Sequence, residues 1–507
     1  MNYNNPGFRL SKTGRNPHIE RKAAMTDHTR WKTRLHLMPP TGWLNDPNGL
    51  CQFHGVYHVF FQYRPGDAFG GGNTGWGHYT SPDLIHWTFQ GTPLLPDQAF
   101  DQNGVYSGSA LTDNGSMLLY YTGNVKKPGD YDYTYAGREA NVVLVTSRDG
   151  MEFGEKELLL TNDSYPADCT CHVRDPKVWR DEDDYYMVLG ARMRGKGNAP
   201  DYGGVLLYRS KDCRRWDYCN TLTSPESFGY MWECPDAFVV GGIPLLSVSP
   251  QGLTRESRRF QNIYQSGYFT VTGELTGAYT LSEFKEWDMG FDFYAPQTFC
   301  DEKGRRILIG WMGLPDIKEE YQNPTTEDGW QHVLTIPREL YANSAGFLCQ
   351  RPVSEFESLR RTKHTIQDNE PIHINAPFDM LIFPENTDTK QPAGDTVITL
   401  YDSLRIRCSS SRSECSMEFL PASSPEGSPS ETSRQSPGCG RTIRRANIPA
   451  TISQIRIICD TSAVEVFFGD GETVMSTRIY PDPDTPAAVA VEGGTGCLWE
   501  MDGLEVR

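Results

Sequence analysis

The sequence lacks the long apolar segments that membrane-spanning proteins need. No window of about 18 apolar residues occurs in the 507-residue chain, so no helix is expected to span a membrane. The first 30 residues are polar, with several basic side chains and no apolar core. An ordinary secretory signal is therefore not expected, and the sequence predicts a cytoplasmic protein.

Basic residues are also in short supply. The chain has 48 lysines and arginines against 65 aspartates and glutamates, which gives a formal net charge of −17 at pH 7. Such a surface repels a polyanion unless a basic patch offsets the charge. The composition therefore argues against nucleic acids and anionic membranes as partners.

The cysteine pattern of a disulfide framework or a zinc site is missing too. The 13 cysteines are odd in number and scattered, which is typical of reduced thiols. Cys169, Cys171 and His172 lie close together, but no second pair of ligands follows at the spacing of a zinc finger. We therefore expect no metal site.

What the sequence has instead is a unit of about 60 residues that occurs five times. Each unit opens with a short polar string, at residues 43–49, 106–109, 173–176, 232–236 and 292–296. An apolar stretch typical of a strand follows in each, at residues 57–63, 117–121, 185–189, 244–248 and 306–311. A Ser-x-Asp turn comes next, at Ser81, Ser147 and Ser210, with an aromatic residue four positions after the Asp. A degenerate version occurs at Ser282.

Five such units, each long enough for four short strands, predict an all-β fold with a five-bladed propeller. The opening strings would then face the central channel. Carboxylates that are far apart in the sequence can meet in one pocket in this way. The tryptophans of the Ser-x-Asp turns, Trp87 and Trp216, are expected in the core.

The rest of the chain predicts a second all-β domain. Short alternating strand patterns recur between residues 379 and 491, as in a β-sandwich. We expect a polar tail at residues 1–30, the propeller at 31–345, a linker with a short helix at 346–365, and the C-terminal sandwich at 366–507. Residues 422–438, rich in Ser, Pro, Glu and Gly, predict a mobile loop. The sandwich is expected to brace the propeller or to form the contacts of a homodimer.

The opening strings contain carboxyl groups suited to the cleavage of a glycosidic bond, which needs one group to protonate the leaving oxygen and another to attack or to activate water. Asp46 lies in an Asn-Asp-Pro-Asn-Gly turn that leaves its carboxylate at a strand end. Glu233 has apolar neighbours in the sequence, and an apolar surround would favour the protonated form that a general acid needs. Arg174 and Asp175 are a candidate ion pair that could hold sugar hydroxyls and stabilise a cationic transition state. Each string alone is typical of an ordinary turn or strand end; their shared phase in the repeat favours a joint function.

Together these strings resemble glycoside hydrolase family 32, the β-fructofuranosidase family of invertases and sucrose-6-phosphate hydrolases. The similarity extends over residues 31–507. It implies that Asp46 is the nucleophile, Glu233 the general acid/base and Asp175 the group that stabilises the transition state. It further implies that the enzyme needs no metal or organic cofactor. The residues that it implies for substrate binding are Asn45, Gln62, Trp76, Tyr106, Ser107, Arg174 and Trp311. Gly75 and Gly77 would let Trp76 lie at the mouth of a loop.

The resemblance also implies a retaining hydrolase of sucrose, sucrose 6-phosphate or short fructo-oligosaccharides that forms a covalent fructosyl-enzyme. A fructosyltransferase would use the same residues with a sugar as the acceptor, and stays an alternative. A binding propeller without catalysis would be expected to lack one of the carboxylates, and an inverting hydrolase of arabinan or xylan would need them farther apart. A phosphate subsite needs arginines, lysines or helix N-terminal amides near the leaving sugar. The sequence does not place them, so the substrate stays open.

Overall fold

The structure is a computed structural model that describes residues 29–317, 321–385, 394–421, 436–449, 452–482, 485 and 487–507. Apart from Thr29 and Arg30, the predicted polar tail lies outside the described residues, as do residues 422–435 of the predicted mobile loop. Over the described part of the chain, no helix is both long and apolar enough to cross a membrane.

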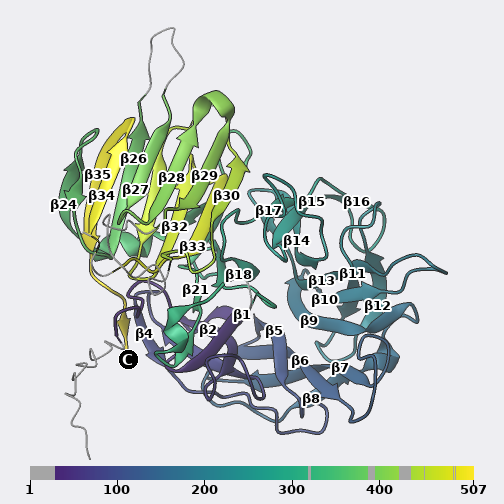
Figure 1. The fold of residues 1–507 in the computed structure, drawn as a ribbon. Coiled ribbons are helices and arrows are strands. Elements are labelled where there is room, and N and C mark those ends of the chain that lie inside the picture. The colour runs from purple at the N-terminus through teal and green to yellow at the C-terminus, as the bar shows by residue number, and fades with distance from the viewer. Residues whose placement is uncertain are drawn as a thin grey trace, which may run out of the picture.

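Five mainly antiparallel sheets surround a common axis as the blades of a propeller (Figure 1). Blade 1 contains β1 (Gly42–Phe53), β2 (Val56–Arg64), β3 (Gly75–Ser81) and β4 (His86–Phe89). Blade 2 contains β5 (Val105–Asp113), β6 (Ser116–Lys126), β7 (Arg138–Ser147) and β8 (Glu157–Leu160). Blade 3 contains β9 (Cys169–Asp181), β10 (Asp184–Met193), β11 (Tyr202–Ser210) and β12 (Asp217–Leu222).

The last two blades carry short additional strands. Blade 4 contains β13 (Met231–Val240), β14 (Ile243–Gln251), β15 (Gly267–Gly273), β16 (Tyr279–Leu281) and β17 (Lys285–Glu286). Blade 5 contains β18 (Tyr294–Cys300), β19 (Arg306–Met312), β21 (Val333–Leu334), β22 (Arg338–Ala342) and β23 (Leu348–Pro352). The five-bladed propeller that the repeat predicted is confirmed.

The ring of blades closes at blade 1. The innermost strands contact one another in the order β1, β5, β9, β13 and β18, and β18 contacts β1 again. The short strand β20 (Trp330–Gln331), which lies between β19 and β21 in the chain, pairs in parallel with β1. At the other edge of the blade, β36 (Glu505–Val506) pairs in parallel with β4, so the C-terminus of the chain returns to the first blade (Figure 1).

The apolar stretches of the repeat form the second strand of every blade, namely β2, β6, β10, β14 and β19. These strands are apolar because neighbouring blades cover both of their faces. The Ser-x-Asp strings close the turns after the third strands: Ser81 Oγ accepts from the Leu84 N–H at 2.8 Å, and Asp83 Oδ1 accepts from the His86 N–H at 2.9 Å. Trp87 and Trp216 are 1% and 8% exposed, which confirms their place in the core.

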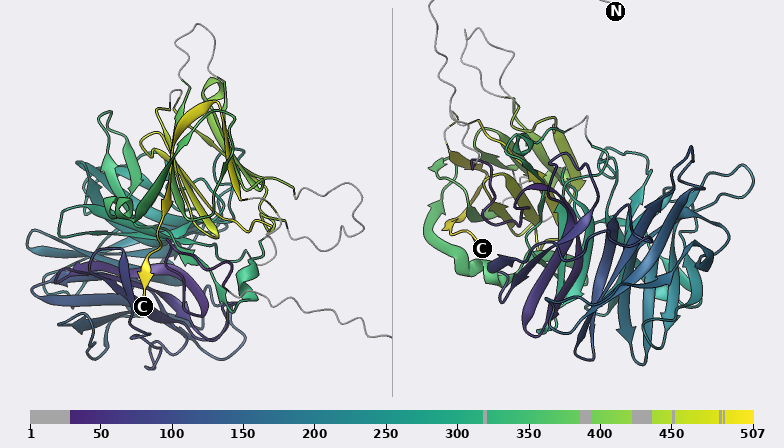
Figure 2. Two further views of the ribbon diagram at one scale, coloured as in Figure 1. Left: turned by 90° about the vertical axis from the view of Figure 1, so that its left-hand side faces the viewer. Right: turned by 90° about the horizontal axis from the view of Figure 1, so that it is seen from below.

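The C-terminal part of the chain forms two six-stranded sheets, the sandwich that the sequence predicted (Figure 2). The first sheet contains β24 (Arg360–Ile366), β35 (Gly494–Met501), β26 (Phe378–Pro384), β31 (Ile455–Cys459), β32 (Ala463–Phe468) and β33 (Thr473–Arg478). The second contains β25 (Ile372–His373), β34 (Ala488–Glu492), β27 (Thr396–Leu400), β28 (Leu404–Ser409), β29 (Glu414–Phe419) and β30 (Ile443–Asn447).

Helical structure in the described residues is limited to short 3₁₀ turns: η1 (Asn162–Ser164), η2 (Pro324–Thr326), η3 (Ser354–Leu359) and η4 (Ser410–Arg412). Of these, η3 lies between the last strand of blade 5 and the first strand of the sandwich. It lies within the segment in which the sequence predicted a short linker helix. We propose η3 as the boundary between the two domains.

A buried network of charges joins the sandwich to the propeller. His36 lies between Asp460 and Glu465 of the sandwich, with ring nitrogens 2.8 and 3.0 Å from the carboxylates. Glu465 also pairs with Arg338 of blade 5 at 2.7 Å, and Arg338 pairs with Asp288 at 3.1 Å. All five side chains are fully buried, so this network is shielded from water.

Candidate active site

A cavity of about 480 Å³ lies where the innermost strands of all five blades meet. Each of these strands contributes two consecutive residues to the lining: Asn45 and Asp46, Tyr106 and Ser107, Arg174 and Asp175, Glu233 and Cys234, and Tyr294 and Ala295. The opening strings of the repeat therefore face one pocket, as their common phase predicted.

A β-bulge in the innermost strand turns these residue pairs toward the cavity. The pairing register shifts at Asp46 in β1, at Ser107 in β5, and directly after Glu233 in β13 and Tyr294 in β18. A proline follows the bulged residue in four of the five strings, where it cannot donate a hydrogen bond to the neighbouring strand. The bulged Asp175 has a φ of 65°, which a residue with a Cβ rarely adopts. The regular strand pairing is thus interrupted where polar side chains lie at the axis of the propeller.

The carboxylate of Asp46 is 5% exposed and held by short polar contacts. Ser107 Oγ donates to its Oδ2 at 2.7 Å, and the amides of Asn48 and Asn45 each donate at 3.2 Å. Burial raises the pKa of Asp46 to about 7; the hydrogen bond from Ser107 opposes this increase, and the charges of Asp175 and Glu233 add to it. The carboxylate is therefore fixed in position but easily protonated.

Asp175 is held by backbone and side-chain donors from two blades. Its Oδ2 accepts from the Cys234 N–H at 2.9 Å, and its own N–H donates to Thr122 Oγ1 at 2.8 Å. Burial raises the pKa of Asp175 to about 6 despite the nearby charge of Arg174. The charge of Glu233 raises the pKa of both Asp46 and Asp175, and the charge of Asp175 raises that of Asp46 further, so the pocket easily retains a proton near neutral pH.

Glu233 is surrounded by donors, so the apolar surround that its sequence neighbours predicted is wrong. Its Oε1 accepts from Arg174 Nη2 at 2.7 Å and Nε at 3.0 Å. Its Oε2 accepts from Tyr294 OH at 2.6 Å and Gln251 Nε2 at 2.7 Å. Trp232 and Pro235 do not line the cavity. Trp232 packs in a hydrophobic core instead, because adjacent side chains of a strand point to opposite faces. Arg174 pairs closely with Glu233, while its distance to Asp175 is 4.0 Å.

Most of the predicted substrate-binding residues line the cavity. Asn45, Gln62, Tyr106, Ser107, Arg174 and Trp311 all do so. Gln62 donates to the Val105 carbonyl at 3.1 Å, which fixes its amide beside β5. Asn45 Oδ1 and Trp311 Nε1 are buried atoms for which the described residues provide no hydrogen-bond partner.

Trp76 is the exception among these predictions. It does not line the cavity but is fully buried, packed against Phe60 and Tyr121 at 5.8 and 6.2 Å between ring centroids. Its indole N–H donates to the Tyr106 carbonyl at 3.2 Å. The flanking glycines do not form a loop mouth, because Gly75 and Gly77 are both within β3 and make room for Leu94 and Phe61.

Asp292, the acidic residue of the fifth opening string, also lies outside the cavity lining. Its carboxylate accepts from Arg441 Nε and Nη2, both at 2.7 Å, and from the Arg478 N–H at 2.9 Å. Both arginines belong to the sandwich. This string therefore contributes a contact between the domains, and its Tyr294 contributes the contact with Glu233.

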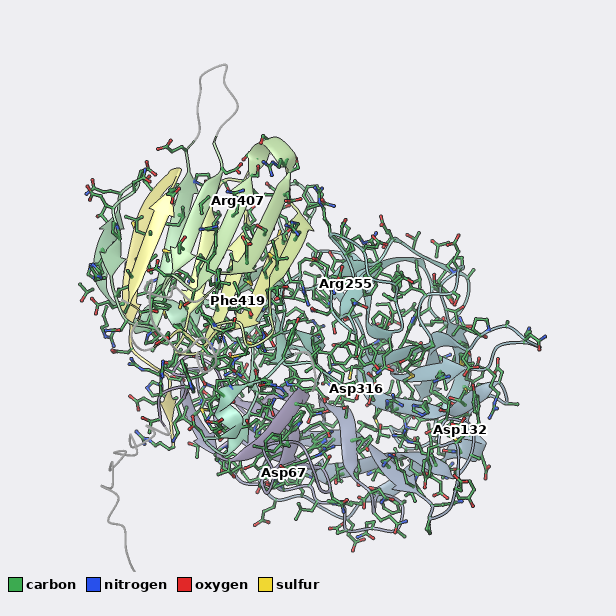
Figure 3. The ribbon with its side chains drawn as sticks, viewed as in Figure 1. Asp67, Asp132, Arg255, Asp316, Arg407 and Phe419 are labelled. Carbon is green, nitrogen blue, oxygen red and sulfur yellow. The ribbon has the colours of Figure 1, made fainter. Side chains whose placement is uncertain are left out.

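Several residues of the cavity were missed by sequence reasoning. Tyr294 precedes Ala295 and Pro296 just as Glu233 precedes Cys234 and Pro235, so the phase of the repeat could have revealed it. His172 lies on β9, two residues before Arg174, outside the opening string. The other missed residues have no such signal, because they lie on outer strands and loops: Arg64, Arg192, Tyr230, Gln251, Tyr264 and Asp316. Figure 3 shows Asp316 near the middle of the propeller. Among the described residues, no group of three or more His, Cys, Asp and Glu side chains is arranged to hold a metal ion.

Family models match both domains of the chain. The N-terminal domain of glycosyl hydrolases family 32 matches residues 36–352, and the C-terminal domain of that family matches residues 402–501. The chain belongs to glycoside hydrolase family 32. Two family 32 relatives are 36% identical: sucrose-6-phosphate hydrolase of Bacillus subtilis (strain 168), with 94% of each chain covered, and raffinose invertase of Escherichia coli, with 92% of this chain and 93% of the relative covered.

Solved structures of family 32 enzymes have the same fold. Sucrose-6-phosphate hydrolase from Lactobacillus gasseri matches with a TM-score of 0.80 at 27% identity, over 94% of each chain. A mutant Bombyx mori β-fructofuranosidase in complex with sucrose matches with a TM-score of 0.76 at 29% identity, over 94% of this chain and 95% of the other. The chain is thus a family 32 glycoside hydrolase with the propeller and sandwich of that family.

Proposed function

We propose that this chain is a retaining β-fructofuranosidase that hydrolyses the fructosyl bond of sucrose or sucrose 6-phosphate. The observation that carries the proposal is the convergence of Asp46, Asp175 and Glu233, from three different blades, on one polar cavity. A retaining glycosidase needs a nucleophile and a general acid on opposite sides of the scissile bond, about 5 Å apart. A relative named sucrose-6-phosphate hydrolase, another named raffinose invertase and a solved β-fructofuranosidase in complex with sucrose support the assignment.

In the first step, Glu233 protonates the oxygen that links fructose to the leaving sugar, and Asp46 attacks the anomeric carbon of fructose. The bond to the leaving sugar breaks, and a fructosyl ester forms on Asp46. Asp175 and Arg174 line the same cavity. The carboxylate of Asp175 stabilises the positive charge that develops on the fructose ring, and both residues hold hydroxyls of the sugar.

The general acid needs a proton at the start of this step. Burial and mutual repulsion make the carboxyl cluster retain a proton near neutral pH, since the pKa values of Asp46 and Asp175 are raised to about 7 and 6. A proton that moves within the cluster to Glu233 leaves Asp46 ionised for attack. In the second step Glu233 removes a proton from water, and the hydroxide cleaves the ester to release fructose.

The pocket also offers groups that suit a sugar. Asn45 Oδ1 and Trp311 Nε1 are buried and lack a partner among the described residues, so a sugar hydroxyl can satisfy each of them. Gln62 and Ser107 line the same space. We propose that these four residues position fructose. The cytoplasmic location and the homodimer expected from the sequence stay predictions.

The proposed function is tested by measuring fructose release from sucrose, sucrose 6-phosphate, kestose and inulin with the purified protein. We expect release from sucrose or its 6-phosphate with retention of configuration, which proton NMR of the first product formed will show. Accumulation of longer oligosaccharides in place of free fructose would instead indicate a fructosyltransferase. Release of fructose from none of the four would contradict the proposal.

A further inference from the structure

One wall of the active-site cavity is strongly basic. Four residues of blades 2 and 3 form this wall: Arg138 of β7, His172 and Arg174 of β9, and Arg192 of β10. A chain of contacts leads along it from the general acid. Arg174 binds Glu233 at 2.7 Å and donates to His172 Nδ1 at 2.8 Å, and Arg138 Nη1 lies 3.4 Å from His172 Nε2. The wall is unusual in a chain whose net charge is −17.

The low pKa of His172 reflects the positive charge of this wall. Burial, together with the charges of Arg174, Arg138, Arg192 and Lys126, lowers the pKa of His172 to about 2. The imidazole is therefore neutral, and it separates two guanidinium groups without offsetting their charge. An anion that enters the cavity on this side is attracted by several cations at once.

Arg138 is the cation of the wall that lacks a carboxylate partner. Arg174 pairs with Glu233, and Arg192 pairs with Asp201 at 2.8 Å. The Arg138 guanidinium donates to the neutral Asn124 at 3.0 Å, lies beside His172 and lies 5.8 Å from the centroid of the Tyr106 ring. Among the described residues no carboxylate lies within ion-pair distance of it. Burial and the charge of Arg174 together lower the pKa of Arg138 to about 10, although the charges of Tyr106, Glu233 and Asp175 oppose this effect. A half-buried cation without a carboxylate at ion-pair distance is costly, and an anionic ligand would reduce that cost.

The position of the wall fits the leaving sugar. Under the proposed function, Glu233 protonates the oxygen that the leaving sugar carries away, so this sugar lies beside Glu233. Arg174 connects Glu233 directly to His172 and then to Arg138. The cavity carries a further carboxylate at Asp316, where Tyr264 OH donates to Oδ2 at 3.1 Å. Asp316 therefore disfavours an anion near its own position and leaves the arginine wall as the place for one.

We propose that Arg138, together with Arg192, binds a phosphomonoester on the leaving sugar, so that sucrose 6-phosphate is preferred over sucrose. This inference rests on the proposed function. Guanidinium groups bind phosphate oxygens through paired, charge-assisted hydrogen bonds, and Arg138 still has donors to offer. Free glucose 6-phosphate, the product that leaves, is then a stronger ligand than glucose.

The first test compares kcat/KM for sucrose 6-phosphate and for sucrose in the wild type and in Arg138→Gln. We expect the ratio of the two to exceed ten in the wild type and to fall by about ten- to hundredfold in the variant, as the loss of a charge-assisted hydrogen bond predicts. Arg148→Gln is the control, because Arg148 is an exposed arginine of the same blade outside the cavity and its loss should leave the ratio unchanged. Added salt should lower kcat/KM for the phosphorylated substrate more than for sucrose.

The second test does not depend on catalysis or on the folding of a variant. Isothermal titration of the wild-type protein with glucose 6-phosphate, glucose and inorganic phosphate should show the tightest binding for glucose 6-phosphate. Equal binding of glucose and glucose 6-phosphate would overturn the inference, as would equal kcat/KM for the two substrates or an unchanged ratio in Arg138→Gln. Tighter binding of inorganic phosphate than of glucose 6-phosphate would overturn it too, since the site would then not recognise a sugar. If glucose 6-phosphate binds through Arg138 but no fructose is released, the anion site stands and the proposed hydrolase fails.

Discussion

Ser107 and Asp46 form the short hydrogen bond that sets the protonation of the proposed nucleophile. Asp46 must be ionised to attack, and burial raises its pKa to about 7, so kcat/KM should rise as the pH increases toward that value. The bond from Ser107, at 2.7 Å, lowers the pKa. In Ser107→Ala the pKa therefore rises, and the ascending limb of the pH profile of kcat/KM should move up by about one pH unit.

Ser109→Ala is the matched control for that shift. Ser109 lies on the same strand but outside the cavity, where its Oγ accepts from the Val178 N–H at 3.2 Å. Its removal should leave the midpoint of the limb in place. A limb that moves equally in both variants, or in neither, would mean that Ser107 does not tune Asp46.

Glu233→Gln tests the general acid. The variant keeps an acceptor for Arg174 and the size of the side chain but cannot give up or take a proton. We expect kcat for fructose release to fall by about 10²–10⁴-fold, the usual contribution of general acid–base catalysis. Glu226→Gln, an exposed glutamate of the preceding loop, should retain activity. Near-normal turnover in Glu233→Gln would exclude Glu233 from the chemistry.

At the level of the strand, the bulge in β5 connects the fold to the site. Gly108 follows Ser107, and its N–H donates to Asn48 Oδ1 at 2.7 Å. A Cβ at this position would lie 1.9 Å from the Tyr120 carbonyl oxygen of the neighbouring strand. The strands can approach so closely only because glycine has no side chain.

Gly108→Ala should therefore push β5 away from β6 and displace the contacts of Asp46. We expect a loss of about 1–3 kcal/mol in the free energy of unfolding and a clear fall in activity. Urea denaturation and fructose release will measure the two effects. Gly66→Ala is the control, since a Cβ there meets nothing within 4 Å. Equal stability of the two variants would show that the bulge tolerates a side chain.

The elements were predictable to different degrees for physical reasons. The second strands of the blades could be predicted because burial on both faces leaves a continuous apolar signature, as in β2 and β6. The convergence of Asp46, Asp175 and Glu233 followed from the phase of the repeat. The contacts of single residues could not be predicted in this way. Gln251 and Tyr294, for example, contact Glu233 from other strands and are distant from it in the sequence. Trp76 was misplaced because two glycines can serve close packing as well as a loop.

At the scale of the whole molecule, Asp292 and Arg441 form a buried ion pair that joins the fifth blade to the sandwich. Both side chains are almost fully buried and make two hydrogen bonds of 2.7 Å. Asp292→Asn would leave Arg441 buried without its counter-ion, which costs about 3–5 kcal/mol. Urea unfolding should show this loss, and the double variant Asp292→Asn/Arg441→Met should recover part of it. A double variant less stable than the single one would contradict this account.

His36 adds a pH-dependent contact between the domains. Burial opposes its charge, but the carboxylates of Asp460 and Glu465 outweigh that effect and raise its pKa. In turn, burial opposes the ionisation of Asp460 and Glu465, but the nearby positive charges, with His36 among them, lower their pKa values. The stabilisation from His36 is fully present below its unfolded pKa of about 6.5 and is lost as the pH rises through the raised value. The stabilisation from the two carboxylates is present above about pH 4 and is lost as the pH falls through their lowered values.

His36→Gln should therefore destabilise the protein most between about pH 5 and 6.5, where His36 is charged in both the folded and the unfolded chain. At higher pH the wild type loses the same charge interaction, so the difference in the free energy of unfolding between wild type and variant should shrink. Urea unfolding at pH 5.5, 7.5 and 9.5 will measure that difference. His373→Gln removes an exposed histidine of the sandwich and should show no such trend. A difference for His36→Gln that is the same at all three pH values would mean that packing of the ring, and not its charge, holds the two domains together.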